Sequence, residues 1–234
     1  MILCLETATN ICSVALCDRT GIIALKESKE QKSHAALLTV FIDDILRENH
    51  IRARELEAIA ISKGPGSYTG LRIGVSVAKG IAYAASVPLI GIDTTLSMFW
   101  GIKQSGKRNR EADKNTLFCP MLDARRMEVY YAIYDNMGTL IKSIAAEIIK
   151  EDSFISVPES HEIVFFGDGA AKCREIINHP KALFENDFRI SASHMHIPAF
   201  QHFETHDFED VAYFEPFYLK DFITSKPRKN ILGI

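Results

Sequence analysis

Short apolar runs separated by turn-forming residues open the chain. The stretches TATN and DRTG favour tight turns, so we predict three strands, over residues 2–6, 11–17 and 22–27. A helix is then predicted over residues 33–48, with Ser33 as its N-cap. Seven of the ten residues from Leu37 to Leu46 are apolar, whereas a surface helix needs an apolar arc of only about 100°. This width suggests that the helix buries a second face.

Strands and helices alternate through the rest of the first half. The segment LEAIAIS predicts a strand that ends at the glycine-rich loop SKGPGSYTGLRIG. It is followed by a predicted helix over residues 70–86, a strand at PLIGI and a helix over Thr94–Gln104, capped by Thr94 or Thr95. The polar stretch Lys103–Lys114 has no apolar rhythm and indicates a linker. We therefore expect an N-terminal domain at residues 1–103.

The second half loosely repeats the order of strand, turn and helix. TLFCPMLDA, EVYYAIYD, GTLIKSIAAEII and EIVFFGDGA each predict a strand, and a helix is expected over residues 171–178. A further helix and a short terminal segment follow from SASHMH onward. We assign residues 104–234 to a reduced second domain, whose last segment packs back on the first. Alternating strands and helices place the chain in the α/β class.

Composition narrows the class of protein. Hydrophobic residues make up 47% and charged residues 24% of the 234 residues, as in ordinary soluble globular proteins. The net charge of -3 predicts no strong affinity of the chain itself for nucleic acid or membranes. The five cysteines form no C-x-x-C pair, which favours buried, reduced thiols in a cytoplasmic protein. Lys79 and Pro88 interrupt the apolar stretch that comes nearest to a membrane span, so we expect neither a span nor export.

The glycine loop is the first candidate for chemistry. A phosphate-binding P-loop ends in Gly-Lys-Ser/Thr, but no lysine follows Gly70. A dinucleotide fingerprint is closer, since Gly64-Pro65-Gly66 follows a strand and Asp93 ends the next one. Its third glycine falls one place late, and Pro65 removes a backbone N–H that would bind phosphate. A nucleotide- or dinucleotide-binding enzyme that uses the Gly64–Gly70 loop stays open as the alternative.

The helix after this loop carries small residues at every fourth position: Gly70, Gly74, Ala78 and Ala82. Gly74 and Gly80 each cost about 1 kcal/mol of helix propensity, which suggests that another element approaches the backbone closely. Together with the wide apolar arc of residues 37–46, this row predicts a surface that binds a partner or a second copy of the chain. The expected contact residues are Leu37, Phe41, Gly70, Arg72, Gly74, Val77, Ala78 and Ile81.

Several ordered motifs together resemble one known family. LCLETATNICSVAL, AIAISKGPGSYTGLRIGVSVAKGIAYAASVPLIGIDTT, MLDARRMEVYYA and the terminal PFYLKDF are similar, in this order, to motifs of the TsaB (YeaZ-like) family. The resemblance covers most of the chain and is weakest over residues 140–195. It implies the actin/Hsp70/sugar-kinase fold, in which two ribonuclease H-like subdomains carry mixed sheets flanked by helices.

The resemblance also implies a non-catalytic role in tRNA modification. Members of the family act as scaffold and activator beside the related TsaD protein and the ATPase TsaE, in an assembly that places a threonylcarbamoyl group on a tRNA adenosine. TsaD relatives carry two metal-binding histidines after the strand that corresponds to PLIGI, whereas Thr94 and Met98 stand at those places here. Neither side chain binds a hard catalytic metal. We therefore expect no catalytic residue, no metal, contact with tRNA only through the complex, and a homodimer when the chain is alone.

The same superfamily binds nucleotide phosphates at its first hairpin turn through the motif D-x-G-[ST]. This chain has Glu6-Thr7-Ala8-Thr9 there, with alanine in place of the glycine. We expect no cofactor of its own, and ATP or ADP only at the interface with the partner. The residues of this vestigial nucleotide or interface loop are Glu6, Thr7, Thr9, Gly64, Pro65, Gly66, Ser67, Tyr68 and Thr69.

Three other groups of residues leave two interpretations each. Asp123 and Arg125 form either a functional turn, in which acid and guanidinium orient each other, or a hairpin turn with a local ion pair. The histidines between His194 and His206 include His202 and His206 at i, i+4, which suits either a metal site or a polar helix face. The basic runs KQSGKRNR and KPRKN either touch tRNA phosphates or form a solvated linker and tail.

Overall fold

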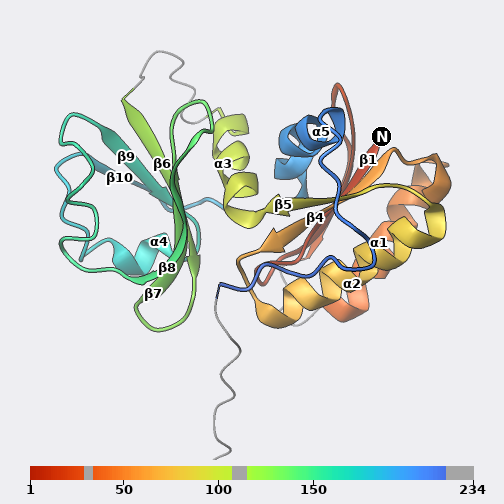
Figure 1. Cartoon of the computed structure of the whole chain (residues 1–234), viewed down its shortest axis with the longest axis horizontal. Helices are drawn as coiled ribbons and strands as arrows, with labels where there is room; N and C mark the ends of the chain where they lie inside the picture. Colours follow the sequence, from red (N-terminus) through yellow and green to blue (C-terminus); the bar gives the residue numbers. More distant parts are fainter. Residues whose placement is uncertain (29–33, 107–114, 220–234) are drawn as a thin grey trace, which may run out of the picture.

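Two sheets with the same strand order organise the chain (Figure 1). The computed structural model describes residues 1–28, 34–106 and 115–219. Helix α3 (Thr94–Gln104) lies between the two sheets, which divide the chain into a first and a second lobe. Most of the predicted linker 103–114 and all of the basic run KPRKN lie outside the described residues, so their two interpretations stay open.

The first sheet has the order β3-β2-β1-β4-β5. Its strands are β1 (Ile2–Glu6), β2 (Cys12–Asp18), β3 (Gly21–Ser28), β4 (Ala58–Gly64) and β5 (Leu89–Asp93). The first three strands form an antiparallel meander, because short turns join them, whereas β4 runs parallel to both β1 and β5. The longer connections to β4 and β5 contain helices α1 (His34–Glu48) and α2 (Tyr68–Ala85), with the 3₁₀ turn η1 (Ala53–Glu55) before β4.

The second sheet repeats this topology in the order β10-β9-β6-β7-β8. Its strands are β6 (Thr116–Asp123), β7 (Glu128–Tyr134), β8 (Leu140–Ile148), β9 (Glu162–Phe166) and β10 (Ala182–Glu185). Again the first three strands pair antiparallel and the last two pair parallel. The duplicated mixed sheets confirm the predicted α/β fold of two ribonuclease H-like lobes.

The helices, unlike the strands, are not repeated in the second lobe. Residues 149–161, between β8 and β9, contain no helix. Helix α4 (Ala170–Cys173) has 4 residues at the place where α2 has 18. The layer formed by α1 and α2 therefore has no counterpart on the second sheet.

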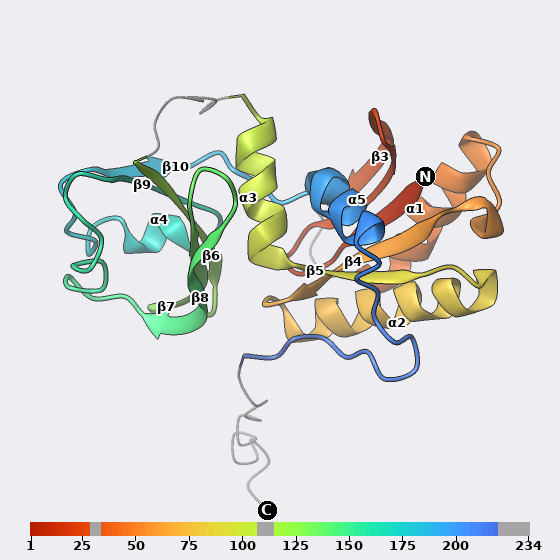
Figure 2. The same ribbon diagram turned by 45° about the horizontal axis from the view of Figure 1, so that its top comes forward.

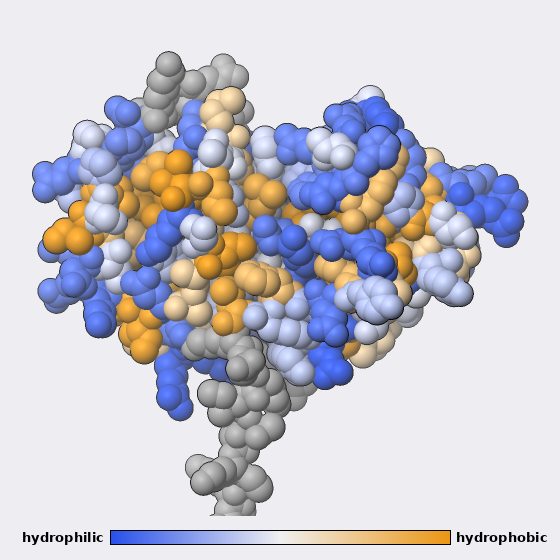
Figure 3. Space-filling view, in the orientation of Figure 1, coloured by the Kyte–Doolittle hydropathy of each residue, from blue (hydrophilic) through white to orange (hydrophobic). Residues whose placement is uncertain are grey.

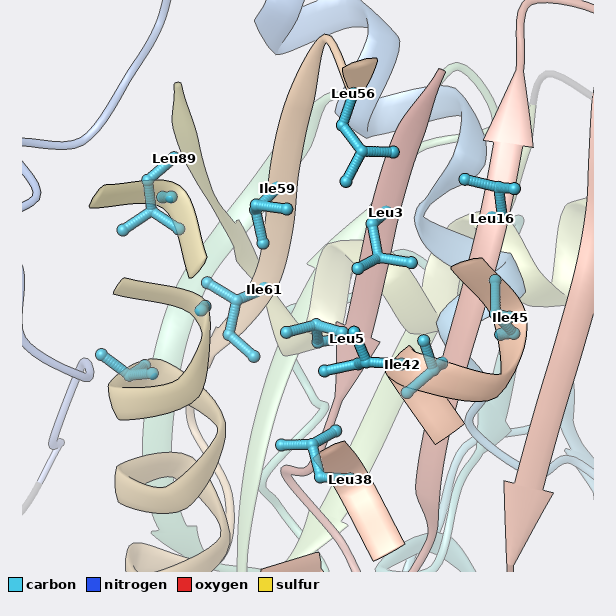
Figure 4. Close-up of a cluster of buried hydrophobic side chains, with 14 of the residues drawn as sticks. Leu3, Leu5, Leu16, Leu38, Ile42, Ile45, Leu56, Ile59, Ile61 and Leu89 are labelled. Atoms are coloured by element: carbon cyan, nitrogen blue, oxygen red, sulfur yellow. The ribbon is translucent and has the colours of Figure 1, made fainter. Parts of the chain in front are cut away.

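One hydrophobic core fills the space between the first sheet and helices α1 and α2 (Figure 4). Leu3, Leu5 and Leu16 point from the sheet toward Leu38 and Ile45 of α1, and each of these side chains is at most 1% exposed. Full burial of one such side chain contributes roughly 1.5–3 kcal/mol to folding. One face of the apolar arc of residues 37–46 is therefore buried in the core of the first lobe.

The other face of the first sheet is covered by residues from the end of the chain. The 3₁₀ turn η2 (Ala192–Met195) and helix α5 (His196–Glu204) pack Met195 and Ala199 against Ile2 and Ile90. The chain then passes β5 and runs along α2 toward the gap between the lobes (Figure 2). Residues from the second half of the sequence therefore belong spatially to the first lobe.

Several predicted boundaries differ from the structure. Helix α2 begins at Tyr68 rather than at residue 70, because Ser67 caps it by accepting a hydrogen bond from Gly70 N. Asp93, and not Thr94 or Thr95, occupies the N-cap position of α3. The helix expected over residues 171–178 stops at Cys173, and β10 was not predicted. All five cysteines are buried free thiols, as predicted.

Candidate functional site: the interlobe cleft and the helix layer of the first lobe

The glycine loop after β4 packs directly on the β1–β2 turn. Ser67 N donates a hydrogen bond of 2.7 Å to Ala8 O. A β-carbon on Gly66 would lie 2.4 Å from the same carbonyl oxygen, so glycine is required for this approach. Gly66 and the N–H of Ser67 therefore pack against Ala8, at the turn that the resemblance marked as a vestigial nucleotide loop. The loop is a packing contact of the chain with itself.

The row of small residues on α2 faces inward. A β-carbon on Gly70 would lie 2.1 Å from Thr7 O, and one on Gly74 would lie 2.2 Å from Thr7 Oγ1. Ala78 is fully buried in the core. The expected partner contact through Gly70, Gly74 and Ala78 is therefore wrong: the close approach that the sequence predicted is made by the turn of the same chain. Gly80, in contrast, has open space around it.

Glu6 is a fully buried carboxyl at the end of β1. Its Oε1 accepts hydrogen bonds from Ala8 N at 2.6 Å and from Ser62 Oγ at 2.9 Å. Its Oε2 is buried and has no hydrogen-bond partner among the described residues. Burial raises the pKa of Glu6 to about 7, and the two hydrogen bonds to Oε1 offset part of that rise. The carboxyl that the resemblance assigned to a vestigial nucleotide loop is therefore enclosed by protein.

The carboxylate of Asp123 in the β6–β7 turn is bound by a lysine of α4. The carboxylate of Asp123 forms an ion pair with Lys172 of α4 and accepts a hydrogen bond of 2.8 Å from Arg125 N. Lys172 Nζ also donates to the carbonyl oxygens of Arg126 and Glu128. The guanidinium of Arg125 forms no ion pair with Asp123, so the expected mutual orientation of acid and guanidinium is not present. The ion-paired hairpin turn is the better interpretation, with Lys172 as the partner.

Equivalent turns of the two lobes meet at a cleft of about 570 Å³. Thr9, Ser67 and Thr69 line it from the first lobe, and Asp123 and Arg125 line it from the second. Tyr130, Asp168 and Tyr218 are among the further lining residues that were not predicted as part of a site. Asp168 could have been found from the internal repeat, because Gly167-Asp168-Gly169 lies at the end of β9 as Gly64-Pro65-Gly66 lies at the end of β4.

The charges in this cleft are nearly balanced. Among the described lining residues Arg125 supplies a cation, whereas Asp123 and Asp168 supply carboxylates. Lys172 neutralises Asp123 from outside the lining. Recognition of a triphosphate relies on several cations, helix N-termini or a bound metal. Of these features, the cleft has the N-terminus of α2 at Tyr68 and the single cation of Arg125, and its other side chains offer hydroxyl, amide and aromatic contacts.

The positions that correspond to a metal pair lie in the core. Thr94 is fully buried and Met98 is 1% exposed, both on α3. Over the described ranges, no three or more His, Cys, Asp or Glu side chains gather closely enough to hold a metal ion.

The histidines near the end of the chain are spread apart. Helix α5 ends at Glu204, so His206 lies beyond it and does not share a helix face with His202. His202 instead pairs with Asp207, at 2.8 Å between Nδ1 and Oδ2. His194 packs against Gly101 and Phe188, and burial lowers its pKa to about 4. The expectation that His202 and His206 share one face is wrong.

The outward faces of α1 and α2 carry the remaining predicted contact residues. Leu37, Phe41, Val77 and Ile81 lie at the edge of the core and are partly exposed. Val40 and Tyr83 are more open, with 49% and 81% of their surface exposed. Arg72 is also exposed. We define the helix face as Leu37, Val40, Phe41, Ile73, Val77, Gly80, Ile81 and Tyr83. The role of these residues in a contact stays a prediction.

No helix in the described part of the chain combines the length and the apolar character needed to cross a bilayer. In one view of the surface, hydrophobic residues gather mainly over the second lobe and beside the gap between the lobes, while polar residues dominate the upper part of the first lobe (Figure 3).

The family model and the curated proteins that match this chain carry names from the same tRNA modification. The family model described as TsaD: tRNA N6-adenosine threonylcarbamoyltransferase matches residues 24–225. The tRNA threonylcarbamoyladenosine biosynthesis protein TsaB of Escherichia coli is 34% identical over 133 residues, which are 57% of this chain and 54% of that protein. The protein of the same name from Bacillus subtilis is 27% identical over 146 residues, 62% of this chain and 60% of that protein. The match thus spans little more than half the length of these curated relatives.

Solved structures support the same assignment at the level of the fold. YeaZ from Pseudomonas aeruginosa superposes with a TM-score of 0.79 over 93% of this chain and 99% of that chain, at 23% sequence identity. A P. aeruginosa protein described as similar to peptidase YeaZ gives a TM-score of 0.80 over 94% and 99%, at 24% identity. The family model matches most of the chain, so the chain belongs to the family described as TsaD: tRNA N6-adenosine threonylcarbamoyltransferase, and proteins named TsaB and YeaZ are among its similar relatives.

Proposed function

We propose that the chain is a non-catalytic scaffold and activator subunit of the machinery that makes tRNA N6-threonylcarbamoyladenosine. It binds the catalytic TsaD protein through the helix face and works with TsaE, and it contacts tRNA through the complex. Alone, it forms a homodimer by the same face. The cytoplasm, where tRNA is modified, is the proposed location.

The helix face is the observation that carries this proposal. Large apolar side chains of α1 and α2 remain partly exposed there, beside the open backbone at Gly80. Exposed apolar residues that cluster on two neighbouring helices are typical of protein interfaces. An open glycine on such a face lets another helix approach closely.

The lack of chemistry at the superfamily's usual positions supports a scaffold. Thr94 and Met98 are buried at the metal positions, and Glu6 is enclosed below the turn that would receive phosphate. Ala8 and Gly66 are in contact where that phosphate would enter. We propose that any ATP or ADP in the assembly is held at the interface with TsaD rather than by this chain alone.

Co-purification with TsaD from the same organism tests the proposal. Val77→Asp should abolish complex formation and reduce tRNA modification in the reconstituted system to the level without this chain. Ile155→Asp is a matched control, because Ile155 is an apolar residue on the second lobe that is 84% exposed. Normal assembly of the Val77→Asp variant would contradict the proposed partner surface.

Titration with ATP, ADP and NAD tests the alternative, an enzyme that uses the Gly64–Gly70 loop. The isolated chain should show neither micromolar binding nor turnover. Turnover of a nucleotide by the isolated chain would contradict the scaffold and favour the enzyme.

A further inference from the structure

The last described residues, 209–219, pack along α2 and are held there by hydrogen bonds. We call residues 209–219 the terminal strap. Glu209 N donates to Leu89 O at 2.8 Å, and Phe217 N donates to Lys63 O at 2.7 Å. A β-carbon on Gly64 would lie 2.6 Å from Phe217 O, so the strap approaches β4 as closely as a glycine allows. These backbone contacts fix the strap at both of its ends.

Lys79 of α2 holds the middle of the strap. Its Nζ donates to Ala212 O at 3.2 Å and to Phe214 O at 2.8 Å. A lysine that donates to two carbonyl oxygens has one N–H left, and its charge is partly neutralised by the two dipoles. Lys79 therefore acts as a structural tie and is a poor candidate for binding an anion.

A groove of about 340 Å³ lies between the strap and α2. Tyr68, Arg72 and Ser76 line it from α2, and Glu215, Pro216 and Tyr218 line it from the strap. Arg72 and Ser76 of the groove and Gly80 of the helix face are spaced four residues apart on α2, so they are neighbours along one side of the helix. A partner that covers the helix face therefore reaches the groove without a break in the surface.

The side chain of Arg72 is positioned in this groove by contacts with Tyr68. Its guanidinium lies over the ring of Tyr68, 5.4 Å from the centroid, and one of its nitrogens donates to Tyr68 Oη at 3.1 Å. Tyr68 in turn packs on Tyr218 of the strap, with centroids 5.0 Å apart. The ion pairs found among the described residues do not include one for Arg72, which is exposed. A fixed guanidinium loses little rotamer entropy when it binds an acid.

The surroundings favour a carboxylate from a protein rather than the phosphates of RNA. The groove offers one available guanidinium beside Glu215, and the chain has a net charge of -3. Binding to RNA phosphates depends on several cations acting together. A single Arg beside aromatic rings suits instead the bidentate recognition of one Asp or Glu side chain.

We propose that the groove between α2 and the terminal strap receives an acidic side chain of the partner that binds the helix face, and that Arg72 pairs with it. This inference rests on the proposed function, since it assumes that a partner covers α1 and α2. The strap then has a role in binding, because Tyr218 and Tyr68 position the guanidinium. Arg72 supplies charge recognition next to an otherwise apolar contact.

The test measures the affinity of the full chain for its TsaD partner at low and moderate salt. Arg72→Glu should weaken binding by about tenfold or more, with the larger loss at low salt. Arg72→Lys should give a smaller loss, because an ammonium cannot form the bidentate pair. Tyr218→Ala should weaken binding while the denaturation midpoint shows that the chain is folded. Arg54→Glu is the matched control, since Arg54 is an exposed arginine on η1.

The outcomes separate the two proposals. If Arg72→Glu binds like the wild type while Val77→Asp does not bind, the groove proposal is wrong and the helix face stands. If both variants bind normally, the partner surface itself is wrong. Equal losses for Arg72→Glu and Arg54→Glu would show a general charge effect and overturn the groove. Lost affinity for tRNA, with partner affinity unchanged, would reassign Arg72 to RNA.

Discussion

The backbone of Gly70 lies against the carbonyl oxygen of Thr7, so close that a β-carbon on Gly70 would be 2.1 Å from that oxygen. Both atoms belong to rigid backbone, and Thr7 is fully buried. We therefore expect Gly70→Ala to lower the free energy of unfolding by about 2–3 kcal/mol, although alanine favours a helix. Urea denaturation of the isolated chain measures this loss.

Gly80→Ala is the matched comparison, because nothing lies within 4 Å of the position where its β-carbon would be. It should raise the free energy of unfolding by up to about 1 kcal/mol through helix propensity alone. If Gly70→Ala is instead as stable as Gly80→Ala, the contact between α2 and the β1–β2 turn is looser than described.

Glu6→Gln should change how stability depends on pH. The pKa of Glu6 is about 7 in the folded chain, against an ordinary value of 4.5, so the folded state holds a proton between these values that the unfolded state has lost. Stability from this group is therefore present at low pH and is lost as pH rises toward 7. The shift corresponds to a change on the order of 3 kcal/mol. Glutamine, which does not titrate, should remove this decline.

Urea titrations at several pH values between about 4 and 8 measure the effect. The advantage of Glu6→Gln over the wild type should grow as pH rises through this window. A constant difference between the two proteins would show that Glu6 is ionised in the folded chain, and therefore in contact with water or a cation.

His194→Phe should produce the opposite pH dependence. Burial lowers the pKa of His194 to about 4 from an ordinary 6.5, so the unfolded chain binds a proton in this window before the folded chain does. Stability is therefore lost as pH falls from 6.5 toward 4, by about 2 kcal/mol after allowance for partial exposure. Phenylalanine fills the ring's place beside Phe188 and does not titrate. The variant should lack this acid-induced loss, and an unchanged loss would contradict the burial of the ring.

Lys172→Met should destabilise the second lobe more than Asp123→Asn does. Lys172 donates to the carbonyl oxygens of Arg126 and Glu128, at 2.8 and 2.7 Å, and methionine would leave both without this donor. We expect a loss of about 2 kcal/mol for the lysine variant. The Asp123 side chain is 47% exposed, so its charge should contribute less than about 1 kcal/mol. Thermal and urea unfolding of both variants give the order, and the reverse order would contradict the structural role assigned to Lys172.

Local sequence patterns predicted most elements but could not orient α2. The predicted bounds of α3 agree with the structure, because a strand precedes it and a polar stretch follows it, although its N-cap is Asp93 rather than Thr94 or Thr95. On α2, however, one row contains Gly70 and Gly74 and the neighbouring row contains Ile73 and Val77. Either row could face a sheet. Spacing alone does not reveal that the turn at Thr7 needs the glycine row, because that contact joins distant parts of the chain.

Two other features lacked any local signal. β10 has only four residues, ALFE, and their sequence does not alternate between apolar and polar positions. The bond between Lys79 and Phe214 spans 135 positions of sequence and connects a helix with an irregular segment. Such contacts depend on the tertiary fold, and so the groove beside Arg72 was not predicted, although Arg72 itself was.

The unequal lobes have a consequence for stoichiometry. The two sheets share one topology, but the long helices α1 and α2 occur on the first, where the second has a stretch without a helix and the four-residue α4. A contact made by the helix layer can therefore occur once per chain. A contact between the helix layers of two chains therefore occupies the layer of both, so this contact by itself forms closed pairs.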